Sequence, residues 1–338
     1  MNIYDIAREA GVSIATVSRV INGGSVKKET RKLVESVIAE NNFVPSAVAR
    51  NLSGSDNCNI GVLIPDIANP FFAMVLSGIS YTAEQLGYNV FLFGTDESTD
   101  REHRVLQTVK RQRLRGLIAI AVSSDDEETQ RQLNELNADN IPIVLIDRDV
   151  KNTNFDRVFS DDLGGSYRAV KALIEAGHER IATIYGPKTS RPGIQRFDGY
   201  MKAMQEAKLP IREEYILPGD FRQHVAHACM ERLLALPEPP TAVFSSNNLT
   251  TQGCLQCFKE HDIVVGRDIS IIGFDEIEAL QYVNFNLSVV DRPVYEMGRE
   301  AINMLQMRIK EGAVGTFAHH RIVVDTQLIL RGSEKLSK

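Results

Sequence analysis

From residue 59 onward the chain alternates between short apolar runs and longer helical patterns. The apolar runs, such as IGVLIP (60–65), YNVFLFG (88–94) and GLIAIAV (116–122), have the length of buried strands, and the segments between them can form helices of ten or more residues. Parallel strands need such crossover helices, whereas antiparallel strands can be joined by tight turns. The alternation therefore predicts an α/β fold with doubly wound parallel sheets.

This alternation runs through the chain twice. It pauses near residues 148–162, after IPIVLID, and restarts with LGGSYRAVKALIEAG and IATIYG. Two such runs predict two similar lobes with a cleft between them, and a helix at 293–310 with a strand-like stretch at 319–331 would return to complete both. We expect an N-terminal lobe at about 59–160 plus 292–322, and a C-terminal lobe at about 161–291 plus 323–338.

Residues 1–44 have the pattern of three short helices. The first covers Tyr4–Ala10, GVS breaks it, and Ser13 is a suitable N-cap for a second helix that continues to Ile21. A helix, a glycine-containing turn and a second helix are the arrangement of a helix-turn-helix. The apolar stripe of the third helix is Leu33, Val34, Val37 and Ile38. Residues 45–58, PSAVARNLSGSDNC, are interpreted as one short helix and a linker.

The second of these helices carries mostly small and hydroxyl-bearing side chains outside the apolar face formed by Val17, Val20 and Ile21. A recognition helix must enter a major groove about 12 Å wide, where an arginine such as Arg19 can donate two hydrogen bonds to a guanine edge. A small helical bundle with solvated hydroxyls would show the same pattern, so the helix alone leaves both interpretations open. The candidate DNA-binding positions here are Ser13, Ile14, Ala15, Thr16, Ser18, Arg19 and Asn22.

The charge is distributed unevenly between this head and the rest of the chain. Residues 1–55 contain seven Lys and Arg against five Asp and Glu, whereas the remainder contains 31 against 39. A slightly basic head on an acidic body is expected when only the head meets phosphates. The four cysteines are too few and too unevenly spaced for a disulfide framework. With no apolar signal segment or membrane-length run, we expect a cytoplasmic, nucleoid-associated protein with no membrane partner.

Motifs typical of metal sites and enzymes are weak or missing. CLQC (254–257) lies in a predicted helix without a second cysteine pair, which favours buried thiols over zinc ligands. His224 with His227, and His319 with His320, lack a companion set of carboxylates. The chain has neither a G-x-S-x-G elbow nor a phosphate loop. We therefore expect no enzyme activity, no metal and no cofactor.

The blocks IYDIAREAGVSIATVSRVING, VPSAVARNLSGS and NIGVLIPDIANPFF occur in this order, and VFSDD, EAGHERIA, PTAVFSSNN, ISIIGFD and RPVYEMG follow. Over essentially the whole chain they resemble the LacI/GalR family of bacterial transcription regulators, in particular its ribose-type and catabolite-control-like members. The resemblance implies a helix-turn-helix head on a periplasmic-binding-protein-like core. It also implies a homodimer, or a dimer of dimers, on a pseudo-palindromic operator. In the family the short helix after the head inserts a leucine into the central minor groove, which implies this role for Leu52, beside Ala49.

The same resemblance implies a small effector between the lobes. Sugars offer adjacent hydroxyls to carboxylate, amide and guanidinium groups, and their C–H faces stack on aromatic rings. Asp147, Arg148 and Arg196 match a ribose-type pattern. Asp291-Arg292, where a glutamine is common, departs from it, and Ser190 and Pro192 depart from the purine-binding pattern. The candidate effector-binding residues are Asn69, Phe71, Phe72, Asp147, Arg148, Arg196, Phe221, Asn247, Phe274, Asp275 and Asp291.

These observations predict a DNA-binding regulator, expected to act as a repressor of a carbohydrate-utilisation operon under the control of a pentose-like effector. The alternative within the family is a catabolite-control regulator whose main co-effector is a phosphorylated carrier protein; Ile14-Ala15 in the recognition helix resembles that branch. A nucleotide-dependent enzyme would need a phosphate-binding glycine motif, and a solute-binding protein would need an export signal and no DNA-binding head. Whether the effector induces or corepresses is not encoded in these motifs.

Overall fold

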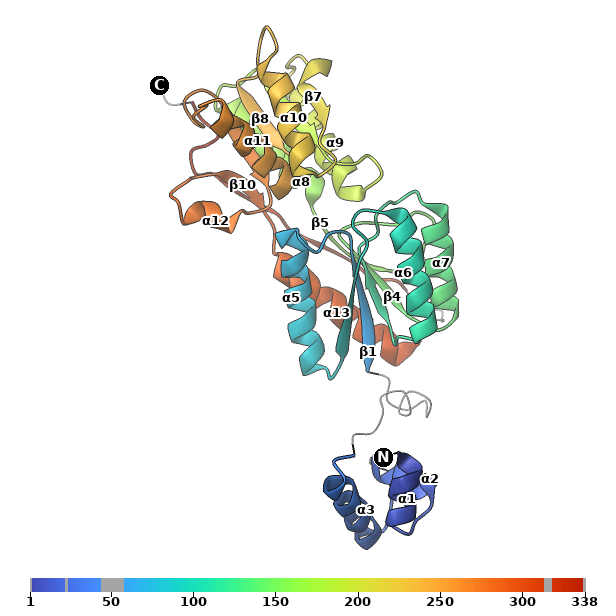
Figure 1. Ribbon diagram of the computed structural model, residues 1–338. Helices are drawn as coiled ribbons and strands as arrows, with labels where there is room; N and C mark the ends of the chain where they lie inside the picture. Colours follow the sequence, from blue (N-terminus) through green and yellow to red (C-terminus); the bar gives the residue numbers. More distant parts are fainter. Residues whose placement is uncertain (1, 22–23, 44–57, 313–317, 337–338) are drawn as a thin grey trace. The chain divides into compact units, whose positions relative to one another are not determined.

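The computed structural model describes residues 2–21, 24–43, 58–312 and 318–336. The chain divides into two compact units, the head (Met1–Cys58) and the core (Asn59–Lys338) (Figure 1). Among the described residues, no helix combines the length and the apolar character needed to cross a membrane.

The head is built from three helices, α1 (Ile3–Glu9), α2 (Ile14–Ile21) and α3 (Lys28–Glu40). Ser13 caps α2 as predicted, since its Oγ accepts the backbone N–H of Thr16 at 3.2 Å. The prediction for Leu33 is wrong: its side chain is 49% exposed. The buried face of α3 centres on Val34 and Val37 and leaves Leu33 at its edge. The buried residues of the head are Ile6, Ala7, Ala10, Val17, Val20, Val34 and Val37.

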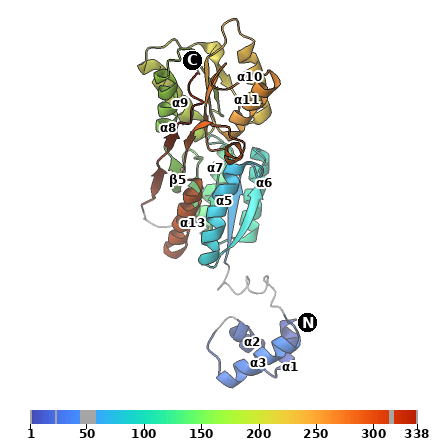
Figure 2. The same cartoon turned by 90° about the vertical axis from the view of Figure 1, so that its left-hand side faces the viewer.

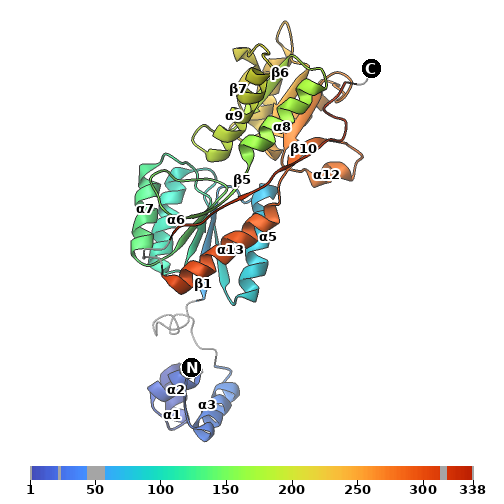
Figure 3. The ribbon, with the colours of Figure 1, turned by 180° about the vertical axis from the view of Figure 1, so that it is seen from behind.

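The first lobe of the core is a six-stranded parallel sheet in the order β11-β5-β4-β3-β1-β2. Its strands are β1 (Asn59–Ile64), β2 (Asn89–Gly94), β3 (Leu117–Ala119), β4 (Ile143–Ile146), β5 (Asp156–Ser160) and β11 (Arg321–Val324). One face packs on α5 (Pro70–Gln85) and α13 (Val294–Glu311), which lie side by side in Figure 3, and the other on α6 (Thr99–Gln112) and α7 (Glu127–Ala138). Helices on both faces of a parallel sheet are the predicted doubly wound arrangement.

The second lobe repeats this order as β12-β10-β9-β8-β6-β7. Its strands are β6 (Ile181–Tyr185), β7 (Ile216–Pro218), β8 (Ala242–Ser245), β9 (Ser270–Phe274), β10 (Ser288–Asp291) and β12 (Gln327–Ile329). The helices α8 (Asp162–Glu175) and α9 (Arg191–Glu206) cover one face, and α10 (Gln223–Leu234) and α11 (Asn248–Glu260) cover the other (Figure 2). The short helices η1 (Glu213–Tyr215) and α12 (Glu278–Gln281) lie in connections.

One strand departs from the predicted parallel sheets. β12 runs antiparallel to β10, because the chain enters β12 from β11 of the first lobe through only Asp325 and Thr326. β12 therefore starts at the cleft, where β10 ends, and runs in the opposite direction. The stretch predicted as one strand at 319–331 is thus divided between the two sheets.

Three connections link the lobes: β5 to α8, β10 to α13, and β11 to β12. The connection at β10 is held tightly in the first lobe, since α13 and α5 approach each other through glycines. A Cβ on Gly78 would lie 2.1 Å from the Tyr295 carbonyl oxygen, and one on Gly298 would lie 2.2 Å from that of Val75. A residue in the connection between β10 and α13 is therefore attached through the backbone to the second lobe on its N-terminal side and to the first lobe on its C-terminal side.

Candidate functional site

The outer face of α2 is the candidate DNA-reading surface of the head. Ser13, Ile14, Ala15 and Arg19 are exposed, and Thr16 and Ser18 are partly exposed. Arg31 of α3 donates from one terminal nitrogen to the carbonyl oxygen of Gly24 at 2.7 Å, and so ties the segment before α3 to that helix. This contact of Arg31 could not be predicted from the sequence, because only the fold brings Arg31 and Gly24 together. Of the other predicted DNA-binding positions, Asn22, Ala49 and Leu52 lie outside the described residues.

The predicted effector residues gather between the two lobes of the core. Ligands of open α/β sheets bind at the carboxyl ends of the strands, and those ends face each other across this cleft. Nine of the eleven predicted positions line one cavity of about 70 Å³. These nine are Asn69, Phe71, Phe72, Asp147, Arg148, Arg196, Phe221, Asn247 and Asp275.

Arg292, at the β10–α13 connection, lies at the centre of this cavity. One terminal nitrogen donates to Asp147 Oδ1 of the first lobe at 2.6 Å, and its Nε donates to Asp275 Oδ1 of the second lobe at 2.7 Å. The guanidinium lies over the ring of Phe71, 4.0 Å from its centroid. Burial alone would lower the pKa of Arg292, but the carboxylates of Asp275 and Asp147 outweigh burial and raise it. Arg292 is thus a permanent cation that ties the two lobes together.

Arg196 forms a second buried ion pair, inside the second lobe. Its Nε donates to Asp162 Oδ1 at 2.9 Å, and a terminal nitrogen donates to the carbonyl oxygen of Ser246 at 2.7 Å. The guanidinium stacks on Phe274, with its carbon 3.6 Å from the ring centroid. Only 2% of Arg196 is exposed. This side chain therefore joins α9 to the start of α8 and to the residue after β8, and it also faces the cavity.

Arg148 is held within the first lobe. Its two terminal nitrogens each donate to a carboxylate oxygen of Glu97 at 2.7 Å, a bidentate pair. Burial would lower the pKa of Arg148, but Glu97 outweighs this effect and raises it. The pKa of Asp147 is lowered, since Arg292, Arg196 and Arg148 outweigh the effect of its burial. The cavity therefore contains ionised groups of both signs, and Arg148, Arg196 and Arg292 are each paired with a carboxylate.

Three side-chain amides mark the helix ends at the cleft. The Oδ1 of Asn69 caps α5 by accepting the N–H of Phe71 at 3.0 Å, and the Oδ1 of Asn247 accepts the N–H of Thr250 at 2.8 Å at the start of α11. Asn248 Nδ2 donates across the cleft to Asn69 Oδ1 at 2.8 Å. This hydrogen bond and the contacts of Arg292 close the lobes on each other.

A family model for the "Bacterial regulatory proteins, lacI family" matches residues 2–46, and one for a periplasmic binding protein-like domain matches residues 170–334. The chain is 35% identical over 335 residues to the HTH-type transcriptional repressor PurR of Haemophilus influenzae (strain PittEE), with 98% of each chain covered. The chain belongs to the LacI family. It is 34% identical over 308 residues to catabolite control protein A of Priestia megaterium, with 90% of this chain and 91% of that one covered.

A solved structure of the transcriptional regulator CelR in complex with cellobiose matches with a TM-score of 0.73 at 28% identity, with 98% and 99% of the two chains covered. This LacI-family chain is a DNA-binding transcriptional repressor rather than an enzyme. Repressors of the family bind operator DNA and small-molecule effectors and form dimers.

Two predicted effector positions of this LacI-family repressor do not line the cavity. Phe274 is fully buried beneath Arg196, so it supports a cavity residue without facing the cavity itself. Asp291 lies at the end of β10, where successive side chains point to opposite sides, and it lines a neighbouring pocket of about 570 Å³ instead. Burial raises the pKa of Asp291.

Glu97, Asn248 and Arg292 are among the residues that line the cavity but are absent from the predicted set. Arg292 is part of the departure from the family pattern, and Asn248 follows the predicted Asn247 in the PTAVFSSNN block, whereas Glu97 lies in a segment with no distinctive motif. The cysteines of CLQC are buried, as predicted. Burial raises the pKa of Cys254, and it raises that of Cys257 to about 11. Both residues therefore belong to the core of the second lobe as neutral thiols.

Proposed function

We propose that this repressor controls a carbohydrate-utilisation operon through a small sugar-like effector, of pentose or ribose type, bound between the lobes of each protomer of a homodimer. The proposal rests on the convergence of Asp147, Asp275 and Arg148 with side-chain amides beside Phe71 and Phe72. Carboxylates and guanidinium groups bind adjacent hydroxyls in pairs, and aromatic faces cover the C–H surface of a sugar. The solved complex of CelR with cellobiose supports a carbohydrate as the effector.

The small size of the cavity indicates how the effector acts. About 70 Å³ is far below the roughly 300–1,000 Å³ of ordinary ligand pockets. An effector must therefore separate the lobes or displace Arg292, and its hydroxyls then replace the guanidinium as partners of Asp147 and Asp275. A ligand shifts a conformational equilibrium only by its differential affinity for the two states. Competition with Arg292 provides such a difference here.

A thermal-shift screen of the full-length protein against pentoses, hexoses, sugar phosphates and nucleosides tests this proposal, because a bound ligand raises the melting temperature by mass action. We expect a pentose to raise it in the wild type and in Asp125→Asn, whose exposed carboxylate pairs with Lys151 outside the cleft. The same sugar should leave Asp147→Asn unchanged. A nucleoside or hexose that stabilises the protein while pentoses do not would contradict the pentose assignment.

A second candidate is a repressor whose main co-effector is a phosphorylated carrier protein. The similarity to catabolite control protein A and the tightly closed cleft favour it. Titrating an operator complex with sugars and with the phosphorylated carrier separates the two candidates. A response to the carrier with no response to any sugar would replace the first candidate by the second.

For DNA binding we propose that α2 reads the major groove of a pseudo-palindromic operator and that Leu52 enters the minor groove at its centre. A side chain that wedges between base steps contributes only where the duplex is bent to fit the protein. Leu52→Ala should therefore weaken specific binding far more than non-specific binding in fluorescence anisotropy. Leu33→Ala, an exposed change in the head, is the control. Equal losses on both DNAs in Leu52→Ala would refute the wedge.

A further inference from the structure

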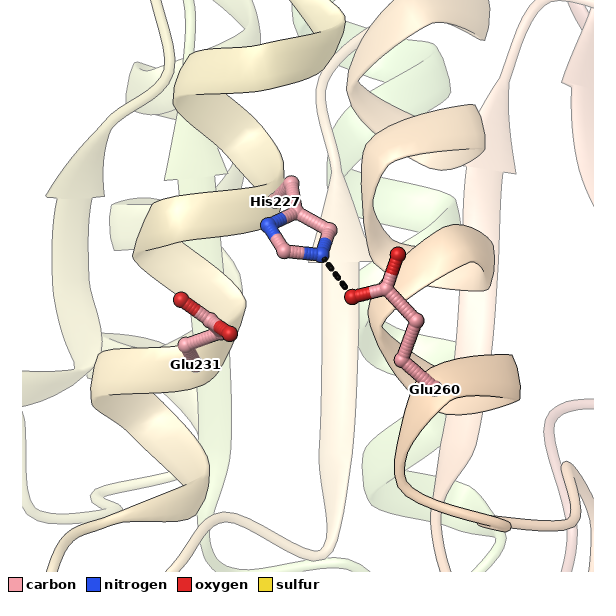
Figure 4. A group of neighbouring side chains, drawn as sticks. All are labelled: His227, Glu231 and Glu260. Carbon is pink, nitrogen blue, oxygen red and sulfur yellow. Dashed lines mark hydrogen bonds and ion pairs between the residues drawn. The ribbon is translucent and has the colours of Figure 1, made fainter.

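The outer surface of the second lobe carries a compact group of metal-binding side chains. His227 and Glu231 lie one turn apart on α10, and Glu260 lies on the neighbouring helix α11 (Figure 4). Their potential ligand atoms all lie within 4.8 Å of one another. His227 Nε2 is 2.7 Å from Glu260 Oε2, and His261 Nε2 is 3.9 Å from Glu231 Oε1. Two imidazoles and two carboxylates therefore meet where the two helices run side by side.

The backbone holds these side chains in place. α10 and α11 approach so closely at Gly253 that a Cβ there would lie 2.3 Å from the carbonyl oxygen of Gln223. Beneath them, Met230 and Cys254 are fully buried. A ligand set on two rigid, closely packed helices needs little reorganisation to bind an ion.

The donor set selects the class of ion. Imidazole nitrogen with carboxylate oxygen suits zinc and its neighbours in the first transition series, whereas magnesium and calcium prefer all-oxygen sites. Zinc–ligand bonds of about 2.0–2.2 Å place donor atoms roughly 3–3.5 Å apart. Rotation of the Glu231 and Glu260 side chains, which are about half exposed, covers the difference. Cys257 is fully buried and is not among the side chains whose donor atoms gather here.

We propose that His227, Glu231 and Glu260 form a zinc-class binding site, with His261 or water completing the coordination. The bound ion clamps α10 to the carboxyl-terminal end of α11 and stabilises the second lobe. The sequence predicts no metal site here, because His224 and His227 have no evident companion carboxylates in the motif. The companions are Glu231 and Glu260, one of which comes from another helix.

Isothermal titration of the untagged, chelator-stripped full-length protein with zinc chloride tests the site. We expect one ion per chain in the wild type and in His224→Ala, a matched control that removes an exposed histidine one turn earlier on α10. His227→Ala should weaken this event by roughly 100-fold, since even the loss of a partner outside the ligands costs about 10–100-fold. Magnesium chloride should give no such event.

Melting temperatures provide a second measurement, which does not require that zinc binding release or absorb heat. Zinc should raise the melting temperature of the wild type and of His224→Ala, but not that of His227→Ala or Glu260→Gln. It should also raise that of Glu296→Gln, a control that changes a carboxylate of α13 in the first lobe, where Glu296 pairs with Arg299. Circular dichroism without metal establishes that each variant is folded. Unchanged zinc affinity in folded His227→Ala, or loss of binding in His224→Ala, would overturn the proposal.

Discussion

The two lobes of the core share one strand order but pair their charged side chains differently. Asp147 follows β4 and Asp275 follows β9, both with left-handed backbone (φ 64° and 69°). The backbone N–H of Asp147 donates to the carbonyl oxygen of Val158, and that of Asp275 donates to the carbonyl oxygen of Val290, each at 2.9 Å. Two residues beyond these valines lie Ser160 in the first lobe and Arg292 in the second, which are therefore equivalent positions.

These equivalent residues contact each other, since Arg292 donates to Ser160 Oγ at 3.0 Å. In the first lobe, Arg148 is paired with Glu97 of the same lobe, so this ion pair does not link the two lobes. Arg292 instead bridges carboxylates of both lobes. The difference shows that a large basic residue at the position equivalent to a serine adds an ionic contact between the lobes.

The strongest way to break this asymmetry is Arg292→Ser, which makes the two positions alike. Asp147, Asp275 and Asp162 would then remain buried without this cation. Removal of one partner from a buried ion pair costs about 3–5 kcal/mol. Urea denaturation should show a loss of this size, and small-angle scattering should show a larger radius of gyration. Unchanged stability and radius would mean that Arg292 does not hold the lobes.

Arg148→Met sharpens the comparison, because it breaks an ion pair confined to one lobe. Hydrogen bonds to charged groups contribute about 1.5–3 kcal/mol, and Glu97 stays partly solvated. We expect a loss in that range by urea denaturation with an unchanged radius of gyration. An increase in radius equal to that of Arg292→Ser would remove the distinction between the two arginines.

The helix pairs of the two lobes also differ. In the first lobe, the buried Glu102 of α6 accepts hydrogen bonds from Thr129 of α7 and the backbone of Val122, each at 2.7 Å. The corresponding pair α10–α11 packs through Gly253. Burial, only partly offset by these bonds, raises the pKa of Glu102 from 4.5 to about 7. The folded protein therefore holds a proton between these pH values that the unfolded chain has released.

This proton makes stability fall as pH rises from about 4.5 to 7, by up to about 1.4 kcal/mol per pH unit for one group. Glu102→Gln removes this dependence and should be more stable than the wild type by about 2 kcal/mol at pH 8. Urea denaturation at pH 5 and pH 8 measures the difference. Glu135→Gln, an exposed change in the same lobe, is the control; a parallel pH dependence in wild type and Glu102→Gln would contradict the assignment.

The smallest effect is expected for a neutral contact between the lobes, the hydrogen bond from Asn248 to Asn69. Asn248→Ala removes the hydrogen bond to Asn69, which is worth about 1 kcal/mol, while Asn69 continues to cap α5. The melting temperature should fall slightly, and a proposed effector should bind with a modest change in affinity. A loss of stability as large as that of Arg292→Ser would mean that the hydrogen bond between the two asparagine amides, rather than Arg292, holds the lobes together.

Much of this architecture could be predicted from the sequence. The alternation of strands and helices predicts both lobes, and residues directly after strands, such as Asp147 and Asp275, meet because the carboxyl ends of parallel strands share one edge. Contacts between distant segments could not be predicted. The pairing of Arg148 with Glu97 spans 51 residues, and β12 is antiparallel only because of where the chain re-enters the second lobe. His227 likewise meets Glu260 only after α10 and α11 pack.

We propose that opening or closing of the interlobe cleft changes how tightly the head binds DNA. Anisotropy of a labelled operator duplex, selected from a random pool, compares wild type with Arg292→Ser at constant salt, with and without the stabilising effector. We expect at least a tenfold change in operator affinity for Arg292→Ser, although this substitution leaves the sequence of the head unchanged. The effector should then change the operator affinity of Arg292→Ser very little. Equal affinities and equal effector responses in the two proteins would contradict it.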